Sequence, residues 1–467
     1  MDKILACGLL ILVCLGPVRA QNAPGLTWAL DRILASPTLA GGITGAMVCR
    51  ADDGAVLYAH DADTRLLPAS NRKLFTAASA LCLLGPSFRA RTEVLAAAKP
   101  DATGTVHGTL YLRGGGDGLL SPADLDALAA ALAGQGIRRI DGNVAGDGSR
   151  FTGGPYGFGW EWDDFSDEEF PQISGLEVNE GVLTVHITAG SAAGDPVSVT
   201  LTPPTDYVSL VVSAKTGAKD GPNDCAAERP WDKNYFRITG TLPVGQTLDV
   251  NVPVKDPDRL AARLFRAALV QRGIAVTGPA VLGQTPAGAA TLAFHDGPPL
   301  SETLARMNKP SDNLLAECFV RLLSPVGSYE AGHELETPVF QKLGVDTDKI
   351  ALVDGCGVGR RDFVTARAVT ALLVGMHRRP DWKLYYESLP IAGVDGTLKG
   401  RMKGTVAAYN VHAKTGTLSQ VRALSGYVTG KSGRLYVFSL LMNNFPGKAK
   451  TAGAVQDKFV EELANSL

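Results

Sequence analysis

The sequence predicts a mixed α/β (α+β) fold in which one domain is interrupted by a large insertion. Helix-like and strand-like segments occur together towards both ends of the chain. The middle, residues 180–250, instead consists of short runs of Val, Thr and Leu separated by Gly, Pro and Asp turns, a pattern typical of an all-β module. The length, 467 residues, also exceeds what one hydrophobic core usually serves. We therefore expect a discontinuous domain that encloses modules of a different kind.

The composition is that of an ordinary globular protein. Apolar residues make up 45% and charged residues 20% of the chain. The net charge is −2 and there is no basic run, so the sequence gives no support to nucleic-acid binding.

The first twenty residues have the pattern of a secretory signal peptide. Lys3 precedes an apolar run, residues 4–15, which Gly16 and Pro17 end before the small residues of Val18-Arg19-Ala20. The run is too short to span a bilayer. We expect residues 1–20 to be cleaved and the protein to be periplasmic; the alternative is an uncleaved anchor. Residues 455–467 are expected to form a helix that packs on its own protein, which leaves at most a peripheral membrane association.

Local patterns predict the elements in chain order. A hairpin is expected at 43–60 and a buried helix at 71–84 that Gly85-Pro86 ends. The further expected segments are strands at 105–112, 138–144 and 275–282, and helices at 122–133, 257–272 and 364–376. More than one helix is expected within 301–323, with a loop at 308–310, and a final strand pair is expected at 423–429 and 434–442.

The cysteines that follow the signal peptide indicate neither a metal site nor a cofactor. They are odd in number, contain no CxxC pair and stand mostly in apolar runs: Cys49, Cys82, Cys225, Cys318 and Cys356. Two of these cysteines can form a disulfide in an oxidising periplasm, but the sequence does not indicate which two.

Ser70 and Lys73 lie three positions apart at the start of the buried helix, so their side chains share one face. A serine hydroxyl becomes a good nucleophile when a base takes its proton, and a lysine held neutral by burial and nearby cations can be that base. Pro68-Ala69 places the serine at the helix start, where backbone N–H groups are unpaired. The alternative is a serine and a lysine on an ordinary helix surface.

Two further motifs carry polar groups that suit an anionic peptide. Ser311-Asp312-Asn313 stands where a loop enters the next helix, and its alternative interpretation is a helix N-cap. Lys414-Thr415-Gly416-Thr417 follows Val411 on a strand-like run. Its lysine and threonine can meet a terminal carboxylate, and its glycine can admit a substrate backbone. The alternative here is a strand end with a turn glycine.

The trio S-x-x-K, S-D-N and K-T-G, in this order, is far more specific than any member. With it the chain resembles class C low-molecular-weight penicillin-binding proteins, the D-alanyl-D-alanine carboxypeptidase/endopeptidase family. The similarity covers nearly the whole mature chain. It is carried by PASNRKLFTAASAL, LYLRGGGDGLL, MNKPSDNLLAE, LVDGCGVGRRDF, SLPIAGVDGTLKGRM and AKTGTLSQVRALSGYV.

The resemblance implies a β-lactamase/transpeptidase-like catalytic domain with a central antiparallel sheet flanked by helices. The gap between Ser70 and Ser311 is much longer than that between Ser311 and Lys414, which fits two nested modules between the first two motifs. The expected ranges are 21–90 and 286–467 for the catalytic domain, 91–175 and 245–285 for an inserted α/β domain, and 176–244 for a nested all-β domain.

The resemblance also implies the site residues. Ser70, Lys73, Ser311, Asn313 and Lys414 would be catalytic, and Thr415, Gly416 and Thr417 would bind substrate. A pocket for the diaminopimelate side chain would be formed by Asp164, Phe170, Arg360, Leu418 and Ser419. The end of that side chain is zwitterionic: Asp164 would meet its ammonium group and Arg360 its carboxylate. The alternative is a solvated acidic loop around Asp164. Cys356, where the family more often has serine, and an acidic loop one residue longer depart from the family pattern.

We therefore expect a serine carboxypeptidase/endopeptidase that acts on peptidoglycan peptides through an acyl-enzyme and is acylated by β-lactams, with no cofactor. A β-lactamase or esterase on the same fold is one alternative, and a non-catalytic cell-wall binding protein is another. The sequence does not set the oligomeric state, so a homodimer stays open.

Overall fold

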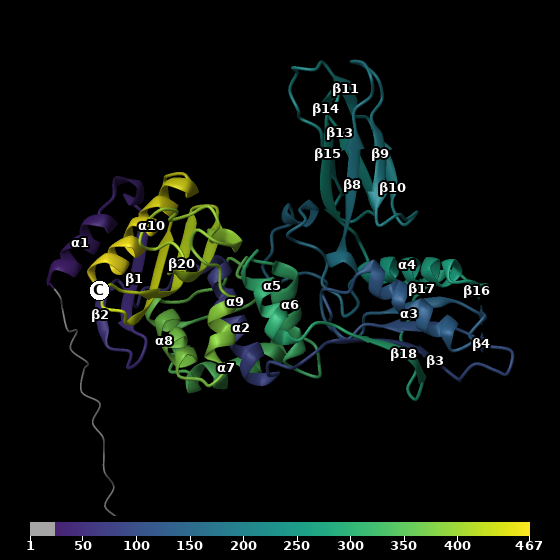
Figure 1. Cartoon of the computed structure of the whole chain (residues 1–467), viewed down its shortest axis with the longest axis horizontal. Coiled ribbons are helices and arrows are strands. Elements are labelled where there is room, and N and C mark those ends of the chain that lie inside the picture. The colour runs from purple at the N-terminus through teal and green to yellow at the C-terminus, as the bar shows by residue number, and fades with distance from the viewer. Residues whose placement is uncertain (1–23) are drawn as a thin grey trace, which may run out of the picture.

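The computed structural model describes residues 24–467, so the predicted signal peptide lies outside the described residues. Figure 1 shows three parts: a sheet with helices on both faces, a second α/β part, and a narrow β arm that projects between them. None of the helices in the described range is long and apolar enough to cross a membrane.

The sheet that carries the site has five antiparallel strands in the order β19-β20-β21-β1-β2. They are β19 (His412–Leu418), β20 (Val421–Thr429), β21 (Leu435–Asn443), β1 (Ile43–Arg50) and β2 (Val56–His60). The central strands are buried on both faces because helices cover each side. The predicted hairpin and the final strand pair are confirmed.

Alternate residues of these strands enter two different cores. Leu424 and Leu440 pack towards α1 (Pro24–Leu34) and α10 (Ala449–Ser466), whereas Ala423 and Leu441 pack towards the other helices. Those helices are α2 (Arg72–Leu83), α5 (Leu300–Asn308), α6 (Asn313–Leu322), α7 (Tyr329–Lys342), α8 (Ala366–His377) and α9 (Trp382–Ser388). Short 3-10 turns complete this part: η1 (Pro37–Leu39), η2 (Ala69–Asn71), η5 (Thr347–Lys349) and η6 (Gly396–Leu398).

The second part contains a five-stranded mixed sheet and a three-stranded parallel sheet. The larger sheet runs β17 (Ala280–Leu282), β7 (Val144–Asp147), β5 (Leu110–Arg113), β3 (Arg91–Ala96), β18 (Ala290–Asp296), and the smaller one β16 (Ala275–Val276), β6 (Arg139–Asp141), β4 (Thr105–His107). Two helices, α3 (Pro122–Gly134) and α4 (Pro257–Gln271), pack against each other and against these strands.

The arm consists of short strands around one apolar core that also includes the second part. Its sheets are β15 (Thr247–Pro253), β8 (Val182–Thr188), β9 (Ser198–Thr202); β10 (Ser209–Val212), β13 (Tyr235–Thr239), β12 (Ala226–Glu228); and β11 (Lys215–Gly217) with β14 (Thr241–Pro243). Two 3-10 turns, η3 (Asp164–Ser166) and η4 (Asn179–Gly181), precede it.

Several expected elements differ in the structure. The strands expected at 105–112, 138–144 and 275–282 are each two short strands, one in each sheet of the second part. In the range 301–323, where helices and a loop before Ser311 were expected, residues 309–312 separate α5 from α6 as predicted. The expected domain boundaries place 286–296 with the catalytic part and 245–253 with the inserted α/β part. Instead, β18 pairs with β3 and β15 pairs with β8 of the arm.

Candidate active site

The nucleophile candidate stands at the junction of η2 and α2. Ala69 has a φ of 46°, and the turn that follows it places half-buried Ser70 at the helix entrance. Lys73 is fully buried, and its Nζ lies 3.0 Å from Ser70 Oγ. The same nitrogen donates to Asn313 Oδ1 at 2.7 Å and to the Cys356 carbonyl oxygen at 3.2 Å. The structure therefore joins the first two motifs through a single amine.

Lys414 of β19 is the second buried amine of the site. Its Nζ donates to Ser311 Oγ at 2.9 Å and to the carbonyl oxygen of Thr415 at 3.1 Å. Burial, together with the positive charge of Lys73, holds the pKa of Lys414 well below its usual value. Ser311 has a φ of 73°, a left-handed conformation that presents its hydroxyl to this lysine.

Asn313 is the first residue of α6, and its amide is held from both ends. Its Oδ1 accepts from Lys73, and its Nδ2 donates to the Glu169 carbonyl oxygen at 2.9 Å. The carboxylate of Asp312 caps the helix by accepting from the Leu315 N–H at 2.8 Å. The capping interpretation is confirmed for Asp312, and it leaves Ser311 and Asn313 free to face the site, as predicted for this motif.

Strand β19 is the edge of the sheet, and it approaches η2 closely. A Cβ on Gly416 would lie 2.6 Å from the Pro68 carbonyl oxygen and 3.1 Å from the Ala69 Cβ, so glycine lets the strand pack against the turn that carries Ser70. That this glycine admits a substrate backbone stays a prediction. Thr417 is exposed on the strand, and its hydroxyl contacts the Arg422 guanidinium.

One cleft of about 220 Å³ is lined by several of these residues, but Lys73, Lys414 and Gly416 are not part of its lining. Its lining is Ser70, Glu169, Phe170, Pro310, Ser311, Asn313, Val358, Thr397, Thr415, Thr417 and Leu418. Glu169, Val358 and Thr397 were not predicted as site residues. Thr397 stands in the SLPIAGVDGTLKGRM block and Glu169 in the acidic loop, so both segments carried a signal that did not single out the residue.

The residues predicted for the side-chain pocket are only partly brought together. Phe170 and Leu418 line the cleft, and Phe170 packs edge-on against Trp160 with ring centroids 5.3 Å apart. Arg360 Nη1 donates to the Ser419 carbonyl oxygen at 3.4 Å. Asp164 accepts from the Glu161 N–H at 3.0 Å and does not line the cleft; burial raises the pKa of Asp164.

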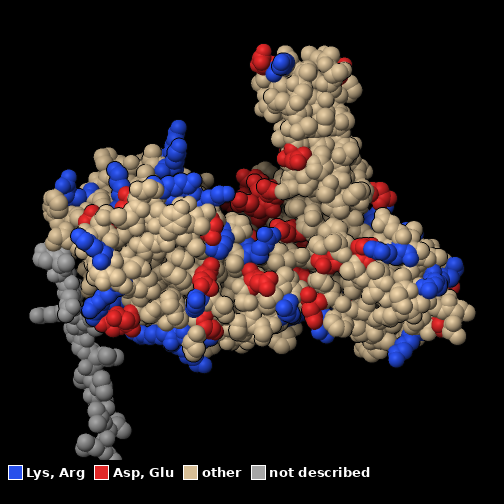
Figure 2. Space-filling view, viewed as in Figure 1, with Lys and Arg blue, Asp and Glu red and all other residues tan. Residues whose placement is uncertain are grey.

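A second cleft of about 240 Å³ adjoins the first and is acidic. Both share Glu169, Pro310, Ser311 and Asn313, and the second adds Glu168, Glu180 and Asp312. Burial raises the pKa of Glu169, of Glu180 and of Asp312. Figure 2 shows acidic side chains gathered where the arm leaves the rest of the molecule.

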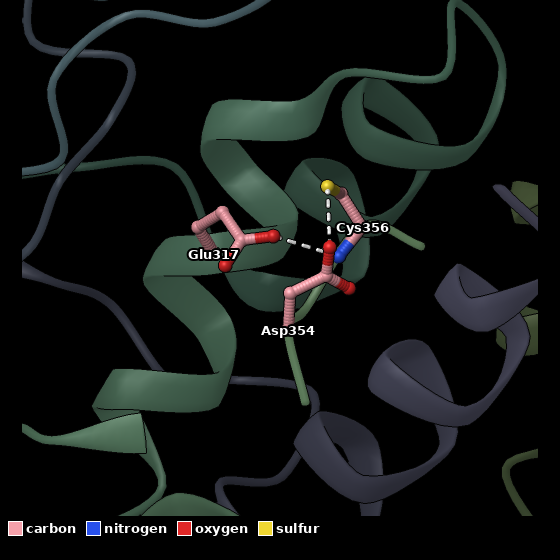
Figure 3. Close-up of side chains that lie close together, drawn as sticks. All are labelled: Glu317, Asp354 and Cys356. Carbon is pink, nitrogen blue, oxygen red and sulfur yellow. Dashed lines mark hydrogen bonds between the residues drawn. The ribbon is translucent and has the colours of Figure 1, made fainter. Parts of the chain in front are cut away.

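Behind Lys73, buried acidic side chains accept hydrogen bonds from the loop that contains Cys356, whose carbonyl oxygen contacts Lys73. Among the described residues, Glu317, Asp354 and Cys356 lie close enough to share a metal ion (Figure 3). However, Glu317 Oε1 accepts from the N–H groups of Gly355 and Cys356, at 2.9 and 2.8 Å, and the Asp354 carboxylate accepts from two more N–H groups of the loop. This bonding indicates a structural role, in which the acids hold the loop beside the lysine.

Comparison with known proteins identifies the family. The model of the D-Ala-D-Ala carboxypeptidase 3 (S13) family matches residues 26–465. The chain belongs to this family. It is 39% identical, over 93% of its length and 84% of the relative's, to a D-alanyl-D-alanine carboxypeptidase of Actinomadura sp. (strain R39). The predicted family, the serine hydrolase activity and the mixed α/β fold are confirmed.

Solved structures agree over more than nine tenths of the chain. Penicillin binding protein 4 of Haemophilus influenzae superposes with a TM-score of 0.82 at 26% identity, over 93% of this chain and 99% of that one. A second structure of that protein, in complex with a β-lactam, gives a TM-score of 0.74 at 24% identity, over 92% and 97% of the two chains.

All five cysteines of the described range, which includes Cys356, are free thiols.

Proposed function

We propose that this enzyme cleaves the terminal D-Ala-D-Ala bond of peptidoglycan stem peptides through an acyl-enzyme on Ser70. The observation that carries the proposal is the set of three partners around Lys73 Nζ. Two of them, the Asn313 amide oxygen and the Cys356 carbonyl, are acceptors only. With two positions of the nitrogen directed at these acceptors, the third faces the Ser70 hydroxyl at 3.0 Å, within reach of its proton.

The reaction begins when Ser70 Oγ attacks the carbonyl carbon and its proton passes to Lys73. The backbone N–H groups of Ser70 and Thr417 stabilise the oxyanion. The C–N bond then breaks, and Ser311 gives its proton to the leaving amine of D-alanine. Lys414 resupplies that proton, which its lowered pKa makes easier to release. Water finally hydrolyses the ester: its hydroxyl joins the acyl carbon, Ser70 Oγ regains the proton held by Lys73, and the proton released by water returns to Lys414 through Ser311.

Substrate recognition uses both ends of the cleft. Asn313 holds the substrate amide, and Lys414 with Thr415 meets the terminal carboxylate. Asp164 and Arg360 are proposed to face the zwitterionic tip of diaminopimelate, with Phe170, Leu418 and Ser419 as the wall. Cleavage of cross-bridges, the endopeptidase reaction, uses the same residues because the bond broken has the same D-alanyl carbonyl.

β-Lactams are proposed to acylate Ser70. The Haemophilus influenzae protein is a penicillin-binding protein by name, and one of its structures holds a β-lactam. After ring opening the leaving amine stays tethered to the acyl group, so water is slow to replace it. A β-lactamase on this fold would instead turn over nitrocefin rapidly, which separates the two activities.

The location proposed is the periplasm, where peptidoglycan lies. The support is the signal-peptide pattern of residues 1–20. At most a peripheral association with the membrane is proposed.

Labelling with fluorescent penicillin tests the nucleophile. Ser70→Ala should abolish covalent labelling and the release of D-alanine from muropeptides, measured by mass spectrometry, while the circular dichroism spectrum stays that of the wild type. Ser87→Ala, an exposed serine after α2, is the matched control and should label normally. Retained covalent labelling of Ser70→Ala would contradict the assignment.

A further inference from the structure

Thr397 is an exposed residue of η6 that lines the catalytic cleft beside Thr415. The roles proposed above do not use it. Its position follows from a segment, residues 389–398, that is fastened to the loop before Ser311.

Lys309 makes the fastening through both its backbone and its side chain. Its carbonyl oxygen accepts from the Thr397 N–H at 3.0 Å, and its Nζ donates to Asp395 Oδ2 at 2.6 Å and to the Leu389 carbonyl oxygen at 3.1 Å. Gly396 has a φ of 54°, and a Cβ there would lie 2.5 Å from the Lys309 carbonyl oxygen. Thr397 is therefore held at a fixed place relative to Ser311, two residues after Lys309.

The hydroxyl of Thr397 is the end of a short chain of hydrogen bonds. Thr415 Oγ1 donates to Thr397 Oγ1 at 2.7 Å. A hydroxyl has one proton, so Thr415 has used its own and can no longer donate to a ligand. The proton of Thr397 has no acceptor among residues 24–467, and this residue lines the cleft.

We propose that Thr397 is a substrate-binding residue that donates a hydrogen bond to the terminal carboxylate of the peptide, with Thr415 polarising it from behind. This inference rests on the proposed function and deepens it, because it moves the direct carboxylate contact from Thr415 to the Thr415–Thr397 pair. A hydroxyl that already accepts a hydrogen bond is a better donor. A charged acceptor makes the bond stronger than a neutral one does.

The test compares two synthetic peptides that end in D-Ala-D-Ala, one with a free carboxylate and one with an amide at the C-terminus. Thr397→Val removes the hydroxyl but keeps the shape of the side chain. It should lower kcat/KM about 10- to 100-fold for the acid and less than about twofold for the amide, because hydrogen bonds to charged groups are the stronger ones. Thr397→Ser restores the hydroxyl and should restore turnover of the acid.

Thr405→Val is the matched control in the same stretch of chain. Its hydroxyl contacts the Met402 carbonyl oxygen, the Ala407 N–H and the Glu461 side chain, and it does not line the cleft. Both peptides should be hydrolysed by this variant at the wild-type rate, with an unchanged melting temperature.

An equal loss on both peptides in Thr397→Val, or no loss on either, would overturn the carboxylate assignment. Failure to restore acid turnover in Thr397→Ser would also count against it. Failure of the proposed function looks different: the wild-type enzyme would then hydrolyse neither peptide and would carry no penicillin label at Ser70.

Discussion

Lys73 and Lys414 place two amines in one buried site, and no acidic side chain of the described residues forms an ion pair with either. Their partners are hydroxyl, amide and carbonyl oxygens, which satisfy hydrogen bonds but do not neutralise charge. The low pKa of Lys414 is the consequence, since a second buried cation is disfavoured beside the first. In the proposed mechanism these two amines transfer protons, and their burial without an acidic partner costs stability.

This arrangement predicts a pH dependence of folding. Because the folded state disfavours the proton on Lys414, while the unfolded lysine takes it up at about pH 10.4, Lys414 destabilises the protein increasingly as the pH falls from about 10 towards its lowered pKa. Lys414→Met removes this contribution. The free energy of unfolding of both proteins can be measured by urea denaturation between pH 7 and 10. The value for Lys414→Met minus the value for the wild type should become more positive as the pH falls.

Lys431→Met, in the exposed turn before β21, is the control. If the difference between Lys414→Met and the wild type does not vary with pH over this range, burial does not lower the pKa of Lys414.

The residues of the three motifs were predictable because helical spacing and strand context are local properties. Thr397 and Glu169 were not predictable as site residues. Each is brought to the cleft by an irregular segment whose position depends on residues far away in the sequence. Thr397 depends on the Lys309 bonds, and Glu169 depends on Asn313, which belongs to α6. No local pattern encodes such a contact.

At the scale of the element, α2 is held at its first residue. Arg72, between the two catalytic candidates, is fully buried and pairs with Glu336 of α7 at 2.7 Å. Its Nε also donates to the Asp354 carbonyl oxygen at 2.8 Å. The helix start is therefore tied both to α7 and to the loop that supplies the Cys356 carbonyl, which fixes Ser70 and Lys73 relative to it.

Glu336→Gln is expected to destabilise the protein by about 3–5 kcal/mol at pH 7, because it leaves the Arg72 charge buried without its partner. Burial opposes the ionisation of Glu336, but Arg72 and His333 outweigh it and hold its pKa at about 2. The stabilisation is thus complete above about pH 4.3, the unfolded value, and is lost as the pH falls towards 2. Urea denaturation at pH 7 and at acid pH measures both effects.

Glu334→Gln, exposed on the same helix, should change the free energy of unfolding by less than about 0.5 kcal/mol. A Glu336→Gln protein as stable as this control would mean that the buried pair does not hold α2.

The second part shows why element boundaries were harder to predict than the elements themselves. The chain leaves the smaller sheet and enters the larger one at Gly108, Gly142 and Gly278, and each crossing divides a run that alternation alone makes continuous. At Gly142 a Cβ would collide with the backbone of Gly108, so the crossings lie against each other. This division depends on neighbouring strands, which the local sequence does not specify.

At the scale of the whole molecule, Arg229 of the arm contacts the loop that forms one wall of the catalytic cleft. This fully buried residue donates to the carbonyl oxygens of Phe165, at 2.9 Å, and Pro253, at 2.7 Å, while Ser166 Oγ donates to the Arg229 carbonyl oxygen. Phe165 and Ser166 belong to the loop whose next residues, Glu169 and Phe170, line the cleft. An insertion far from the motifs in sequence thus supports one wall of the site.

The presence of an insertion was predictable, since the long gap between the first two motifs exceeds what the catalytic sheet needs. The contact between arm and loop was not, because Arg229 stands in an irregular segment with no periodic pattern. Its importance appears only when its burial and its carbonyl partners are seen together.

Arg229→Met is therefore expected to loosen the 161–170 loop and to leave several carbonyl oxygens without a donor, destabilising the protein by about 1–3 kcal/mol. Hydrogen exchange in residues 161–170 should rise. The Michaelis constant for diaminopimelate-containing muropeptides should increase, while acylation of Ser70 by a small β-lactam changes little. Arg237→Met, an exposed arginine of the same arm, is the control for the loss of a positive charge. Unchanged exchange in the loop of Arg229→Met would show that the arm does not support the cleft wall.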